Sequence, residues 1–161
     1  MNKYEPHVIV LPEDDATRQL ATGFVDYPAV HAHRIRVVSP AGGWVKAVDL
    51  MCSSYMPHMR SYNSAHLVLV IDFDKDSDRY RTAIEPRVPA ELRNRVFVFG
   101  PLTNVEVLKR EARRKTEELG RDLASECERG ESQQWSMPEL QHNLPERDRA
   151  LQCIRSIIFD E

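Results

Sequence analysis

Short apolar runs recur along the chain and are separated by segments with helical periodicity. Residues 8–11 (Val-Ile-Val-Leu) and 67–71 (Leu-Val-Leu-Val-Ile) are apolar without a break, as in strands buried on both faces of a parallel sheet. Residues 96–99 repeat this pattern, and residues 33–38 alternate polar and apolar side chains before a glycine-rich turn. We therefore predict four strands.

Helical patterns follow the first two predicted strands. Residues 16–25 place apolar side chains on one face, with Asp14 or Asp15 as the expected N-cap. Residues 44–55 form a second amphipathic segment, which we expect to end before Pro57. The stretch before the fourth strand contains prolines and predicts irregular, partly helical structure.

The last third of the chain is predicted to be mostly helical. Residues 103–106 have capping-box spacing, and the apolar stripe behind them predicts one long helix to about residue 128, ended by Gly130. A polar loop follows, in which Trp135 either anchors a partner or packs on the core. A final helix is expected from Pro145, with Ala150, Leu151, Ile154, Ile157 and Ile158 facing inward.

Alternating strands and helices predict a three-layer α/β fold. We expect a mostly parallel, four-stranded, Rossmann-like sheet with helices on both faces. The length of 161 residues suits one domain, with a core over residues 8–100 and a helical C-terminal extension over 103–161.

Composition narrows the functional classes. Lys and Arg number 22 against 25 Asp and Glu, so no broad basic surface for nucleic acid is expected. The three cysteines form no CxxC pair, which argues against a zinc site or a disulfide framework and favours a reduced, cytoplasmic setting. The longest apolar runs are too short to span a bilayer, so no membrane association is expected.

Acidic side chains follow two of the predicted strands. Glu13 comes two residues after the first strand, and Asp72 and Asp74 come directly after the strand over 67–71. If these strands are neighbours, the three carboxylates converge at one edge of the sheet, where α/β proteins bind ligands. Carboxylates this close resist joint ionisation, and a hard divalent cation such as Mg²⁺ (or Mn²⁺) would relieve the repulsion.

An apolar strand ending in Glu, and a second ending in Asp-x-Asp, resembles the Toprim domain of topoisomerases, bacterial primases and overcoming-lysogenization-defect nucleases. The resemblance covers roughly residues 8–100. It implies that Glu13 acts as a general acid or base, and that Asp72 and Asp74 hold Mg²⁺. No topoisomerase tyrosine or primase zinc module can be assigned, so the small stand-alone nuclease-like members are the nearest comparison.

The resemblance implies a Mg²⁺-dependent phosphodiester-cleaving or nucleic-acid-processing protein, with DNA or RNA as the partner. Asp15, Asp76 and Lys75 form a possible additional metal or phosphate site, and Asp72, Asp74 and Asp76 would share one side of an extended segment. The family often has Gly where this chain has Asp14.

Other interpretations stay open. A receiver-like phosphoacceptor domain would use Asp14, Asp15 and Asp72, and a catalytically degenerate Toprim-like subunit would bind only a protein partner or a second copy of itself. Acids after strands also serve simply as helix caps and turn residues. His31 and His33 lack a third ligand with suitable spacing, so surface or packing roles are favoured for them.

Overall fold

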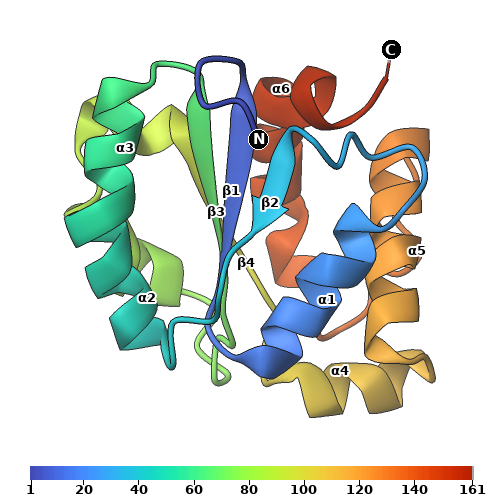
Figure 1. The fold of residues 1–161 in the computed structure, drawn as a ribbon. Coiled ribbons are helices and arrows are strands. Elements are labelled where there is room, and N and C mark those ends of the chain that lie inside the picture. The colour runs from blue at the N-terminus through green and yellow to red at the C-terminus, as the bar shows by residue number, and fades with distance from the viewer. Residues whose placement is uncertain (161) are drawn as a thin grey trace.

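The computed structural model describes residues 1–160 and contains a four-stranded, all-parallel sheet (Figure 1). The strands are β1 (His7–Pro12), β2 (Ile35–Val37), β3 (Ala65–Val70) and β4 (Val96–Phe99), in the spatial order β2-β1-β3-β4. Helices cover both faces of the sheet, so the predicted three-layer α/β fold is confirmed.

The two central strands are paired over their full length. His7 lies opposite Ala65, and Pro12 lies opposite Val70. All six residues of β1 are buried, as expected for a strand covered on both faces. Because β1 and β3 end at the same level, the residues that follow them leave the sheet side by side.

One face of the sheet is covered by the irregular segment before β4, which supplies Ile84, Val88 and Leu92, and by a locally widened helical segment. The helical segment runs through α2 (Trp44–Leu50), a π-helical turn (Met51–Tyr55) and α3 (Met56–Ser61). The prediction that this helix ends before Pro57 is wrong. The amide of Met56 bonds to the Met51 carbonyl, and Pro57 falls in the first turn of α3, where its missing N–H is tolerated.

The opposite face is covered by α1 (Asp15–Val25), α5 (Thr116–Arg129) and α6 (Leu144–Ile158) (Figure 1). Helices α1 and α5 touch backbone to backbone at two glycines. A Cβ on Gly120 would lie 2.3 Å from the Leu20 carbonyl oxygen, and one on Gly23 would lie 2.2 Å from that of Glu117.

The single long helix predicted over residues 103–128 is wrong. Helix α4 (Val105–Ala112) ends at Arg113, which adopts a left-handed φ of 53°, before α5 begins. Its N-cap is Asn104, which accepts from the Val107 amide, rather than the first residue of the predicted capping box. The break redirects the chain, so that α5 docks against α1 through its glycine.

Side chains of α6 cover the hydrogen-bonding edge of β4. Glu146 accepts from the Val98 amide at 2.9 Å, and Arg149 donates to the Val96 carbonyl at 2.6 Å. The Asn143 side chain forms two bonds with the backbone of Gly100. An open edge of this kind is a template for pairing with another chain, and α6 removes that option.

The remaining predictions for the C-terminal third agree with the structure. Trp135 is 6% exposed and donates through Nε1 to the Leu123 carbonyl, so it packs on the core. Four of the five predicted inward residues of α6 are buried, and Leu151 packs partly against them. Across residues 1–160, no helix combines the length and apolar character that a bilayer crossing requires.

Candidate functional site

The candidate site lies beyond the carboxyl ends of β1 and β3, at the bottom of Figure 1. Glu13 continues from β1, and its amide donates to the Val70 carbonyl at 2.8 Å. Its own carbonyl accepts from the amides of Gly42 (2.8 Å) and Gly43 (3.0 Å). Both glycines have positive φ, 93° and 135°, which side chains rarely adopt, so this turn before α2 depends on glycine. The backbone of Glu13 is therefore fixed from two sides.

The structure brings Glu13 and Asp72 together, as the sequence predicts. The Asp72 amide donates to Glu13 Oε2 at 2.6 Å. Asp72 Oδ1 is buried and has no hydrogen-bond partner. A buried carboxylate oxygen without a partner is unusual, because burying a charged polar atom costs free energy unless a partner replaces its water.

Asp74 is placed by a sharp turn. Asp74 and Lys75 have φ values of 50° and 64°, in the left-handed region that non-glycine residues seldom occupy. Phe73 between the aspartates is 3% exposed, and its amide bonds to the Pro101 carbonyl at 3.0 Å. The expectation of an extended segment with three aspartates on one side is wrong, because the chain turns at Asp74. Strain of this type concentrates at functional sites.

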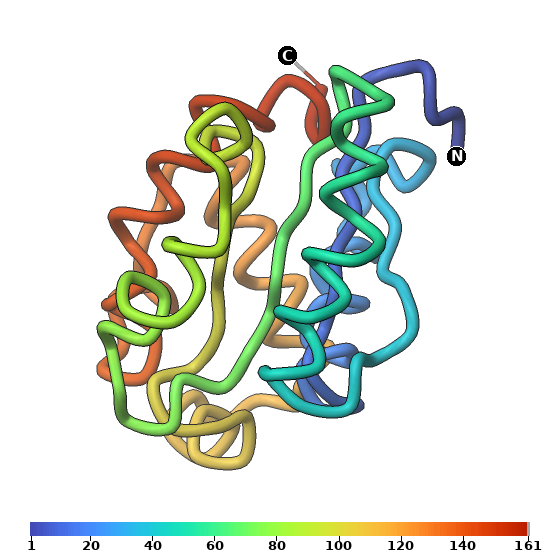
Figure 2. The backbone as a smooth tube through the Cα atoms, turned by 90° about the vertical axis from the view of Figure 1, so that its left-hand side faces the viewer, coloured from blue at the N-terminus to red at the C-terminus, as the bar shows by residue number. Residues whose placement is uncertain are grey.

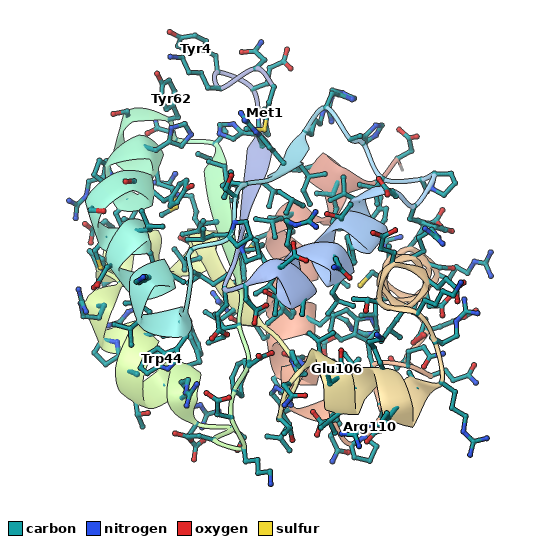
Figure 3. All side chains as sticks on the ribbon, turned by 60° about the horizontal axis from the view of Figure 1, so that its bottom comes forward. Met1, Tyr4, Trp44, Tyr62, Glu106 and Arg110 are labelled. Atoms are coloured by element: carbon teal, nitrogen blue, oxygen red, sulfur yellow. The ribbon has the colours of Figure 1, made fainter. Side chains whose placement is uncertain are left out.

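Arg79 connects the aspartates to α2. Its Nη1 donates to Asp74 Oδ2 at 2.8 Å and to the Asp72 carbonyl at 3.0 Å. Its guanidinium lies 4.7 Å from the ring centroid of Trp44, which is labelled at the start of α2 in Figure 3. This cation-π contact holds Arg79 over the site without neutralising Asp72 Oδ1. From the sequence, Arg79 or Lys75, next to the acids, could neutralise phosphate charge, but no local pattern places Trp44 here.

The two central carboxyls have raised pKa values. Burial raises the pKa of Asp72 from 3.8 to about 7, and the charges of Glu13, Asp14 and Asp74 add to this, while Arg79 acts against it. Burial also raises the pKa of Glu13, although the hydrogen bond from the Asp72 amide lowers it. Burial away from water and nearby negative charge both disfavour the ionised carboxylate, and this raises the pKa.

The donor set has the chemistry of a site for a hard divalent cation. Glu13, Asp72 and Asp74 offer only oxygen atoms, and the unpartnered Asp72 Oδ1 lacks the kind of neighbour a cation would supply. Within residues 1–160, no three His, Cys, Asp or Glu side chains are arranged to hold a metal ion in this conformation. Glu13 is bonded to the Asp72 amide and Asp74 to Arg79, so metal ligation requires these side chains to turn.

The other predicted site residues lie apart from Glu13 and Asp72. Asp15 pairs with Arg18 at 2.8 Å on the exposed surface of α1. Asp76 is exposed and accepts from the Asp78 amide at 3.1 Å as a turn residue, and Lys75 is exposed. Asp14 caps α1, accepting from the Thr17 amide at 2.9 Å, and its charge still reaches the site. His31 pairs with Asp160 rather than with His33 around a metal.

Comparison with known proteins adds no relative: no family model, curated protein or solved structure matches this chain.

Proposed function

We propose that the protein is a Mg²⁺-dependent, Toprim-like phosphodiester-cleaving enzyme, with Glu13, Asp72 and Asp74 as its working groups. The observation that carries the proposal is the pair formed by Glu13 and Asp72: two carboxyls with raised pKa values, one with a buried, unpartnered oxygen, at the ends of adjacent parallel strands. Sites of catalysis are where such perturbed groups gather.

The roles follow from the positions of the residues. Asp72 and Asp74 would hold Mg²⁺, which would orient the phosphodiester and stabilise charge on its oxygens. Glu13 lies beside Asp72 on a backbone that is fixed from two sides, and its raised pKa suits a group that takes up and returns a proton. Arg79 would leave Asp74 when the cation arrives and would then be free to pair with a substrate phosphate.

The proposal is tested with fluorescent single- and double-stranded DNA and RNA, in Mg²⁺, Mn²⁺ or EDTA. We expect metal-dependent cleavage that Asp72→Asn and Glu13→Gln each reduce by about 100-fold or more. Asp26→Asn, an exposed acid at the C-terminal end of α1 and outside both the acidic site and the neighbouring pocket, is the matched control and should keep wild-type activity. No cleavage by the wild type, or equal loss in the control, contradicts the proposal.

One structural observation favours a second candidate, the receiver-like phosphoacceptor. The strand order β2-β1-β3-β4 is the order found in the first four strands of flavodoxin-like folds. In the receiver domains that have this order, acids after the first strand and one after the third share a pocket. Asp72 has the corresponding position after β3, and Glu13 and Asp14 follow β1. Within residues 1–160 the sheet has four strands, so a fifth strand that would carry a lysine is absent there.

A phosphodonor experiment separates the two candidates. Incubation with acetyl phosphate and Mg²⁺, followed by intact mass measurement, adds one phosphoryl group if Asp72 is a phosphoacceptor, and Asp72→Asn prevents the addition. An unchanged mass together with strand cleavage supports the nuclease instead.

A further inference from the structure

A second feature lies on the other side of the loop that carries the aspartates. A pocket of about 560 Å³ opens between this loop, the irregular segment before β4, and the start of α6. Figure 2 shows the yellow-green segment that precedes β4 beside the red α6. Phe73, between Asp72 and Asp74 in sequence, lines the pocket, so the pocket and the acidic site share one short stretch of backbone.

The pocket has the size and the mixed lining of a small-molecule site. Its volume falls within the range of about 300–1,000 Å³ that is usual for ligand pockets. Arg81 and Arg93 are exposed, line it, and form no ion pair among residues 1–160. Arg149, also in the lining, already donates hydrogen bonds to Glu146 and to the Val96 carbonyl at the edge of β4. Arg81 is therefore available to a ligand, as are the terminal nitrogens of Arg93, whose Nε donates to the Val88 carbonyl at 3.2 Å.

His142 is the second, independent sign of a ligand. Its Nδ1 and Nε2 atoms are both buried without a hydrogen-bond partner, and its ring contacts Phe73 with centroids 4.7 Å apart. An imidazole always carries at least one N–H or lone pair that needs a partner when buried. His142 lines the pocket, and because a water-sized atom does not reach its nitrogens in this conformation, a polar ligand atom would satisfy one of them only after the ring turns.

The charges indicate the class of ligand. Arg81 and Arg93 suit phosphate oxygens, whereas Asp78 and Glu85 on the same lining suit sugar hydroxyls or exocyclic amines. A nucleotide offers both kinds of group in one molecule. A bare inorganic anion would use only the arginines and would leave most of the volume empty.

We propose that this pocket receives one nucleotide of the substrate strand, whose phosphate pairs with Arg81 and Arg93 while the neighbouring phosphodiester lies at the acidic site. This rests on the proposed function for the choice of a strand over a free nucleotide. The arginines and His142 are positioning and binding residues, not catalytic ones.

The test measures binding in EDTA, where metal-dependent cleavage cannot occur. Anisotropy of a labelled single-stranded oligonucleotide is followed for the wild type and for Arg81→Gln/Arg93→Gln. We expect the double variant to bind at least about fivefold more weakly, with the salt dependence of log K reduced by about 0.7 for the one phosphate that loses its arginines. Arg110→Gln/Arg129→Gln is the control, because these exposed arginines on α4 and α5 carry the same charge change away from the pocket.

His142→Ala adds a second variant, expected to weaken binding while the control stays at wild-type affinity. No binding by the wild type, or equal weakening in the arginine pair and its control, overturns the proposal. Arginine-dependent binding of mononucleotides without binding of oligonucleotides also overturns it, in favour of a free nucleotide. Oligonucleotide binding that depends on Arg81 and Arg93, without cleavage in Mg²⁺, supports the proposed binding pocket and contradicts the proposed enzymatic function.

Discussion

The two ends of the sheet differ in how well their buried polar groups are hydrogen-bonded. At the amino end, Arg95 Nη1 lies 2.9–3.1 Å from the carbonyl oxygens of Met59, Tyr62, Asn63 and Ala65. His7, fully buried, bonds through Nδ1 to the Glu5 carbonyl and through Nε2 to His58 at 3.0 Å. At the carboxyl end, Glu13 and Asp72 repel one another and one oxygen has no partner.

Figure 3 separates these ends: Tyr4 and Tyr62 lie beside the amino end, and Trp44 lies beside the carboxyl end. The amino end is arranged for stability, because each buried donor has an acceptor. At the carboxyl end, Asp72 Oδ1 lacks a donor, and under the proposed function a bound cation would take that place. Conflicts of this kind are tolerated where function requires them.

The largest effect is expected at the amino end. Arg95→Ala leaves several carbonyls without their charged donor and should lower the free energy of unfolding by about 3–4 kcal/mol. Urea denaturation measures this. The exposed Arg87→Ala is the control and should change stability by less than about 0.5 kcal/mol. Equal effects in both variants would contradict the assignment of Arg95 as a structural centre.

At the carboxyl end, a deletion of charge should stabilise the protein. Asp72→Asn removes a crowded, partly buried charge, and we expect it to raise the free energy of unfolding at pH 8 by about 1–2 kcal/mol while abolishing cleavage. The control Asp26→Asn should change neither by a comparable amount. Destabilisation by Asp72→Asn would show that its carboxylate is a structural partner instead.

The pH dependence of stability follows from the same groups. The pKa of Asp72 in the folded state, about 7, lies above its ordinary 3.8, so the folded state holds this proton more tightly. The resulting stability is fully present below about pH 4 and is lost as the pH rises through 7. We expect the wild type to lose about 1–2 kcal/mol between pH 5 and pH 8, and Asp72→Asn to lose distinctly less, in denaturation series at fixed ionic strength.

The amino end should respond to pH in the opposite direction, with a smaller amplitude. Burial, His7 and Lys3 lower the pKa of His58, so its contribution is present above the ordinary 6.5 and is lost as the pH falls. His58→Gln removes both this titration and the bond to His7, at a cost of about 1 kcal/mol at pH 7.5. A low-pH decline unchanged in the variant would assign it to another group.

The sequence predicted the strands that carry the candidate site, but not the turns and contacts around it. The continuous apolar runs identified β1 and β3, and their neighbouring placement brought Glu13 to Asp72 as expected. The turn at Asp74, the contact of Arg79 with Trp44 and the pocket beside α6 depend on long-range packing that no local pattern encodes. The helix break at Arg113 was missed for a related reason, because the docking of Gly120 against α1 is a tertiary constraint.

Binding of Mn²⁺, followed by electron paramagnetic resonance, tests the central claim most directly, because it asks whether the crowded carboxyls accept a cation. The account predicts saturable binding to the wild type that Asp72→Asn weakens by about tenfold or more, and that Asp78→Asn leaves unchanged. Absence of binding by the wild type, or equal affinity in Asp72→Asn, would contradict the account.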